Sequence, residues 1–104
     1  MQLNNIEVIE KLEGNLKMEF CIGDDRSYVI VYPTSEDFPF HLKNKLFLEL
    51  YDNIVIANGD EVQTGKINKI DTPNETFYFG YNGDNFIVDK NSDFTGIGIV
   101  TRGK

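Results

Sequence analysis

The chain has 104 residues, in which 17 Asp and Glu residues outnumber 10 Lys and Arg residues, giving a formal net charge of −7. This length predicts a single domain over residues 1–104, because domains most often have about 100–150 residues, and the patterns described below make it β-rich. The acidic surplus argues against direct nucleic-acid binding, since contact with a phosphate backbone requires Lys and Arg. A single cysteine, Cys21, excludes an internal disulfide framework.

The sequence shows no feature that directs the chain into or across a membrane. Residues 1–7 contain neither the basic nor the apolar region of a secretory signal. No stretch approaches the roughly 20 apolar residues that cross a bilayer. A lone cysteine also fits a reducing compartment. We therefore expect a cytoplasmic protein without a membrane partner. The abundance of Asn, Ile and Lys is typical of proteins from A+T-rich bacterial or phage genomes.

The first segment, residues 5–13, is compatible with two structures. Asn5 can cap a short helix that ends at Gly14, and a Glu7–Lys11 pair at i, i+4 favours this interpretation slightly. Alternation of apolar residues would instead place the segment in a strand.

The clearest local pattern predicts a β-hairpin over residues 15–32. Leu16, Met18, Phe20 and Ile22 alternate with polar residues, as in a half-buried strand. Turn-forming residues follow at 23–26, and the β-branched and aromatic run 27–32 ends at Pro33.

The middle of the chain is less uniform. Alternating leucines predict a strand over 42–51, although a helix over 36–51 is an alternative because Leu, Lys and Glu favour helices. Residues 54–57 predict a further strand. After a turn at Asn58-Gly59-Asp60, residues 61–70 predict an irregular strand with a bulge at Gly65.

The stretch from Gly59 to Ile67 reads Gly-Asp-Glu-Val-Gln-Thr-Gly-Lys-Ile. It resembles the Gly-Asp-x-Val-x-x-Gly-x-Ile segment of small β-barrels, which occurs in lipoyl and biotinyl carrier domains and in PRC- and SH3-like barrels. The resemblance implies a barrel whose backbone bends at the two glycines. It implies no function, because the modified-lysine motif of the carrier domains is absent.

The C-terminal part predicts a second hairpin and a final strand. Aromatic strand formers at 76–81 and the run 86–89 flank a turn, and residues 94–101 contain two glycines that indicate a bulge or a close crossing by another backbone. The complete pattern predicts a mainly β fold of about seven or eight short strands, arranged as a small antiparallel barrel, roll or sandwich. A helix at 5–13 or 36–51 would make the fold α+β.

The sequence predicts no catalytic residue, metal ligand or cofactor. His41 is the one histidine, so neither a catalytic triad nor a zinc site can be assembled around it. Cys21 has no adjacent basic residue that would activate a thiolate. The loop from Asp84 to Asp89 lacks the ligand spacing of a calcium-binding EF-hand. We therefore expect a protein that is not an enzyme.

Acidic turns and surplus aromatic residues favour a protein–protein interface, in which Tyr and Phe supply contact area and carboxylates meet a basic partner. The candidate interface residues are Asp24, Asp25, Tyr28, Tyr32, Phe38, Phe40, Asp60, Glu61, Tyr78, Tyr81 and Asp84. The leading hypothesis is an acidic inhibitor or immunity-type protein that covers a basic surface of a larger target, for example a phage anti-defence protein that mimics DNA charge. The alternatives are an oligomer that sequesters a nucleotide or other small molecule, and an assembly module of a phage particle.

Overall fold

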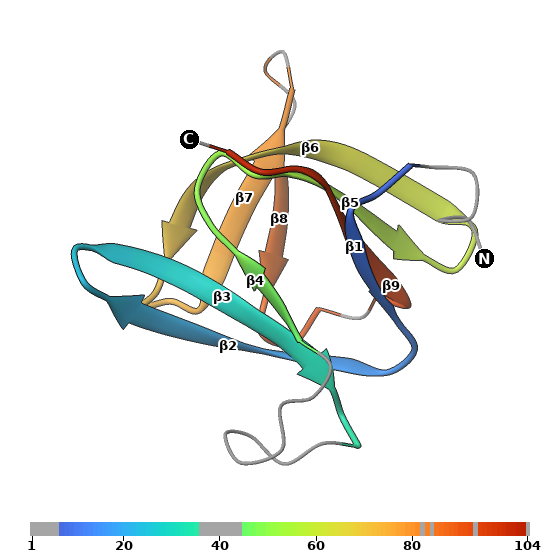
Figure 1. Cartoon of the computed structure of the whole chain (residues 1–104), viewed down its shortest axis with the longest axis horizontal. Helices are drawn as coiled ribbons and strands as arrows, with labels where there is room; N and C mark the ends of the chain where they lie inside the picture. Colours follow the sequence, from blue (N-terminus) through green and yellow to red (C-terminus); the bar gives the residue numbers. More distant parts are fainter. Residues whose placement is uncertain (1–6, 36–44, 82, 84, 93, 104) are drawn as a thin grey trace.

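The chain folds into two antiparallel sheets (Figure 1). The computed structural model describes residues 7–35, 45–81, 83, 85–92 and 94–103, and within them it contains nine strands and no helix. The strands are β1 (Glu10–Glu13), β2 (Leu16–Gly23), β3 (Arg26–Pro33), β4 (Leu46–Leu48), β5 (Asn53–Asn58), β6 (Glu61–Asp71), β7 (Thr76–Gly80), β8 (Phe86–Asp89) and β9 (Gly96–Thr101). The larger sheet has the order β1-β9-β5-β6-β7-β8, and the smaller has the order β2-β3-β4.

The two sheets pack face to face around one apolar core. Strand alternation turns one side of each sheet inward, as in a sandwich. The smaller sheet contributes Met18, Val29, Val31, Leu46 and Leu48, and the larger contributes Ile54, Ile56, Ile67, Phe77, Phe79, Val88, Ile97 and Ile99. The mainly β prediction is confirmed, but the described strands do not close into the barrel that the Gly59–Ile67 resemblance implied.

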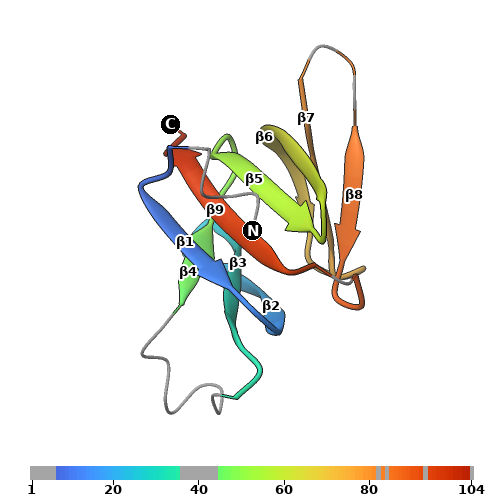
Figure 2. The same ribbon diagram turned by 90° about the vertical axis from the view of Figure 1, so that its right-hand side faces the viewer.

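Both hairpins lie where the sequence predicts them. β2 pairs with β3 from Leu16↔Pro33 to Gly23↔Arg26, and Asp25 in the turn between them has a φ of +66°. β7 pairs with β8 from Thr76↔Asp89 to Phe79↔Phe86, and this hairpin forms one edge of the larger sheet (Figure 2). Local alternation and turn chemistry are sufficient to predict these pairings, because the paired residues are close in sequence.

The helix interpretation of 5–13 is wrong for the described part of that segment. Residues 10–13 form β1, which pairs with β9 from Glu10↔Ile99 to Glu13↔Gly96. A sheet edge supplied by the other end of the chain outweighs the weak helical preference of this segment. In the second ambiguous segment, β4 covers Leu46–Leu48 and residues 45–51 contain no helix, while residues 36–44 lie outside the described part.

The predicted bulge at Gly65 is also wrong, because the register of β6 against β7 shifts between Ile67 and Lys69 instead. Gly65 has a different role. A Cβ at this position would lie 2.6 Å from the Cα of Gly80 on β7, so the two strands approach closely here. At the C-terminal glycines, where a bulge or a close crossing by another backbone was predicted, the neighbouring backbone approaches Gly98: a Cβ there would lie 3.3 Å from the carbonyl oxygen of Glu10 on β1.

The short strand β4 is fixed in place by the turn that follows it and by the C-terminal end of the chain. Asp52, with 1% of its surface exposed, accepts hydrogen bonds from the backbone N–H of Glu49 at 2.9 Å and of Gly103 at 2.8 Å. The Arg102 guanidinium donates to the same carboxylate at 2.9 Å and also to the carbonyl oxygen of Phe47. Asp52 and Arg102 therefore hold the backbone on both sides of Leu48.

Candidate functional site

The outward side of the smaller sheet carries an apolar and aromatic surface, which we call the aromatic face. Its residues are Cys21, Tyr28, Ile30, Tyr32 and Phe47, which alternate with core residues along their strands, and of these Ile30 and Tyr32 are buried. The register places Ile30 between Glu19 on β2 and Phe47 on β4. The rings of Tyr28 and Phe47 lie diagonally across β3 and β4, with centroids 5.9 Å apart and planes tilted by 35°. Such a tilted pair adds to the stability gained by burial alone.

Tyr32 is 3% exposed and therefore offers almost no contact area, in contrast to its predicted place in the interface. Its hydroxyl donates a hydrogen bond to Glu19 at 3.1 Å. Burial, followed by the hydrogen bond to Glu19 and the charge of that carboxylate, raises the pKa of Tyr32 to about 12. Glu19 in turn faces Lys90 at 3.9 Å, which lies after β8 of the other sheet, so Tyr32 belongs to a polar connection between the sheets.

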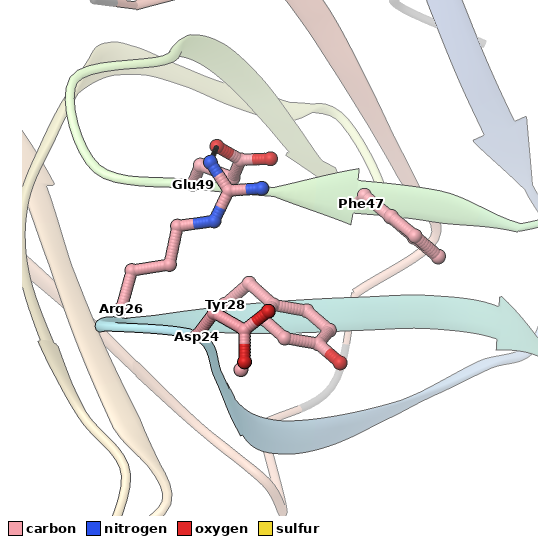
Figure 3. Close-up of a pocket in the computed structure, with 6 residues that line it drawn as sticks. Asp24, Arg26, Tyr28, Phe47 and Glu49 are labelled. Atoms are coloured by element: carbon pink, nitrogen blue, oxygen red, sulfur yellow. Dashed lines mark hydrogen bonds and ion pairs between the residues drawn. The ribbon is translucent and has the colours of Figure 1, made fainter.

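A shallow depression opens next to the aromatic face, where β4 leads into its following turn (Figure 3). It has a volume of about 340 Å³. Its lining consists of Gly23, Asp24, Arg26, Tyr28, Phe47 and Glu49. Small-molecule sites usually enclose about 300–1,000 Å³, so this depression lies at the lower end of that range and is also large enough for one side chain of a partner.

The charged groups of the depression are partly paired. Arg26 donates to Glu49 with a distance of 2.9 Å between Nη1 and Oε1, and Figure 3 shows the two side chains turned toward each other. Asp24 and Asp25 form no ion pair with any described residue. Lys45 lies on the far side of Phe47, with its Nζ 6.0 Å from the ring centroid. Carboxylates therefore lie beside an aromatic pair that already faces a cation.

The predicted interface residues are distributed over three separate places. Asp24, Asp25 and Tyr28 lie together at the β2–β3 turn and the depression. Asp60 and Glu61 are exposed at the β5–β6 turn, at the opposite side of the molecule in Figure 1.

Tyr78 and Tyr81 belong to the larger sheet instead. The ring of Tyr78 faces Lys69, whose Nζ lies 5.4 Å from the ring centroid, and the Tyr81 hydroxyl donates to Asn53 at 2.7 Å. Both tyrosines are therefore engaged within that sheet.

Three predicted interface residues, Phe38, Phe40 and Asp84, lie outside the described residues, as does His41. The depression also contains residues that the sequence prediction did not include, namely Arg26, Phe47 and Glu49. Strand alternation at Leu46-Phe47-Leu48 indicates that Phe47 faces away from the leucines. Its position beside Tyr28, however, depends on the β3–β4 register, which no local pattern predicts.

Cys21 lies at the edge of the aromatic face, and its environment disfavours a reactive thiolate. Burial, and then the negative charge of Glu19, raise the pKa of the Cys21 thiol, and a hydrogen bond with Tyr28 opposes this only in part. Because the thiolate is the nucleophilic form, the neutral thiol that this environment favours is a weak nucleophile.

The described residues also contain no group of three or more His, Cys, Asp or Glu side chains arranged to hold a metal ion. Within the same part of the chain, no helix is long and apolar enough to cross a membrane. Comparison of the chain with protein-family models, with curated proteins and with solved structures found no match. The function has to be inferred from the surface chemistry.

Proposed function

We propose that this chain is a non-enzymatic acidic binding protein that acts by contact with a basic surface of a larger protein. The observation that carries the proposal is the pairing of Tyr28 and Phe47 on an outer sheet face, next to the carboxylates of Asp24 and Asp25, which form no ion pair within the described residues. Phe47 is 38% exposed, which leaves much of its ring available to another molecule. Aromatic anchors of this kind supply much of the binding energy in protein interfaces.

Charge complementarity supports a basic partner. The chain carries a net charge of −7, and the acidic residues at the β2–β3 and β5–β6 turns are exposed. An acidic surface attracts a basic partner over a distance, which accelerates association and makes it sensitive to salt. Occupation of a nucleic-acid-binding surface, as in the DNA-mimic form of the hypothesis, is one mode of action that fits this chemistry.

The nucleotide-binding alternative receives less support from the same site. Phosphate groups require cations or free backbone N–H groups for recognition. The lining residues of the depression contain one cation, Arg26, and Glu49 already pairs with it. Two carboxylates at the same depression, those of Asp24 and Glu49, would repel an anionic ligand.

The test is affinity capture from a lysate of the native host with the immobilised protein. We expect a protein with a basic surface to be retained at about 50 mM salt and lost by about 500 mM, since screening shortens the reach of charges to a few ångströms. Phe47→Ala should reduce the retained amount. Ile87→Ala is the matched control, because Ile87 is 61% exposed on the larger sheet.

Retention that does not depend on salt, or equal losses for the two variants, would refute the proposal. A small molecule that alone raises the melting temperature would favour the sequestering alternative. A closed oligomer in light scattering, without any retained protein, would favour the assembly module.

A further inference from the structure

The depression beside Tyr28 combines two features that suit a cationic guest. The first is aromatic, because the rings of Tyr28 and Phe47 present faces with negative electrostatic potential. The position of Lys45, whose Nζ lies 6.0 Å from the Phe47 ring centroid, shows that this ring already accommodates a cation of the same chain. The second is acidic, because the carboxylates of Asp24 and Glu49 line the same depression.

Arg26 already occupies the position at Glu49 that a cationic group of another molecule would take. Its guanidinium lies 2.9 Å from Glu49, and its side chain is 64% exposed. Exposed ion pairs contribute little to stability, because water solvates the separated charges well and salt screens them. Another guanidinium can therefore replace Arg26 at small cost. The Arg26–Glu49 contact is made by one nitrogen and one oxygen, so the second oxygen of Glu49 has no hydrogen bond within the described residues.

We propose that the depression receives one arginine side chain of the basic partner, which displaces Arg26 from Glu49. In this arrangement the incoming guanidinium lies against the Tyr28 and Phe47 rings and hydrogen bonds to Glu49 and Asp24. Arginine suits the site better than lysine, since its planar group stacks on rings and binds a carboxylate through two N–H donors at once. This inference rests on the proposed function and specifies the chemistry of the partner at one point.

Because Arg26 competes with the incoming arginine for Glu49, removal of Arg26 should strengthen binding. Arg26→Ala removes the internal competitor and a positive charge, so an arginine guest should bind about 2- to 5-fold more tightly. Phe47→Ala removes one ring and should weaken binding about 3- to 10-fold. Glu49→Gln should weaken binding too, because it removes the carboxylate. Improved binding on loss of a side chain is not expected from a site in which Arg26 itself contacts the partner.

The experiment is a titration followed by two-dimensional NMR of the backbone amides and aromatic groups. The probe is N-acetyl-arginine amide, and the control is N-acetyl-citrulline amide, which has nearly the same shape without the charge. We expect saturable shifts for Tyr28, Phe47 and the 23–26 turn with the arginine probe alone, and tighter binding to Arg26→Ala. Asp60→Asn, at the distant turn, should leave the shifts unchanged.

A second titration with a peptide of alternating Lys and Ser separates this inference from the proposed function. If that peptide binds at low salt and the arginine probe produces no localised shift, the arginine site is refuted and the proposed function stands. Equal shifts with the arginine and citrulline probes, or weaker binding to Arg26→Ala, also refute the arginine site. If neither the peptide nor the arginine probe binds at low salt, both proposals fail.

Discussion

The guanidinium of Arg102 lies 2.9 Å from the carboxylate of Asp52, a residue fifty positions earlier in the chain. Arg102 also reaches Glu10 at 3.2 Å and the carbonyl of Phe47, so it connects β1, β4 and the turn before β5. Asp52 at the same time accepts a hydrogen bond from Glu49. The two residues that β4 and its turn contribute to the depression, Phe47 and Glu49, are therefore held by this one ion pair.

We expect Asp52→Asn to destabilise the fold by about 2–3 kcal/mol. Both oxygens of the Asp52 carboxylate accept hydrogen bonds, whereas the NH₂ group of asparagine cannot accept one, so at least one donor would lose its acceptor. Hydrogen bonds to charged groups are worth about 1.5–3 kcal/mol. In a domain of this size the melting temperature should fall by about 10–20 °C. Thermal unfolding measures this, with Asp60→Asn as the exposed control, expected within about 0.5 kcal/mol of the parent. Equal stabilities of both variants would mean that Asp52 has no structural role.

Replacing Tyr51 by glycine should stabilise the fold. The φ of Tyr51 is +72°, in the left-handed region that costs an L-residue about 1–2 kcal/mol. Glycine avoids this cost but gains freedom in the unfolded chain, so we expect Tyr51→Gly to raise the free energy of unfolding by about 0.5–1 kcal/mol. Urea unfolding measures it, with Leu50→Gly as the neighbouring control that should destabilise. A loss of stability in Tyr51→Gly would show that contacts of the ring outweigh the backbone strain.

Tyr32 should make the fold sensitive to alkaline pH. The pKa of Tyr32 is raised to about 12 in the folded state, compared with about 10 in an unfolded chain. The folded protein therefore keeps a proton that the unfolded chain loses. This contribution is complete below pH 10 and disappears as the pH rises from about 10 to 12, with a total of up to about 2 kcal/mol.

The measurement for Tyr32 is urea unfolding at intervals from pH 9 to 12. Tyr32→Phe has no hydroxyl to ionise, so its stability should decline less over this window than that of the parent. Glu19→Gln should give an intermediate decline, since it removes the neighbouring charge that contributes to the raised pKa. Parallel curves for the parent and Tyr32→Phe would contradict the assignment.

Local patterns predict much of this fold but little of the site. The β2–β3 and β7–β8 hairpins follow from alternation and turn residues, because each strand pairs with its immediate successor. The pairing of β1 with β9 joins residues more than eighty positions apart, and the local pattern of residues 5–13, which fits both a helix and a strand, could not predict it.

The site was predicted in part for the same reason. Asp24 and Tyr28 lie in or near the turn of a hairpin that the local sequence predicts, so their proximity could be expected from the sequence. Phe47 and Glu49 reach the depression only through the β3–β4 pairing and the contacts of Asp52. Tyr32 faces outward by alternation and yet is buried, which shows that alternation indicates the face of a residue but not its exposure.

The most direct test of the central claim is the affinity of the captured partner for two double variants. Tyr28→Ala with Phe47→Ala removes the ring pair of the aromatic face, and Tyr78→Ala with Ile87→Ala removes a comparable apolar area from the larger sheet, where these two residues pair across β7 and β8. We predict a loss of affinity of about 30-fold or more for the first variant, since truncated hot-spot residues cost at least about 2 kcal/mol. The second should change affinity less than about 3-fold. Unchanged affinity of the first variant, or a larger loss in the second, would contradict the account.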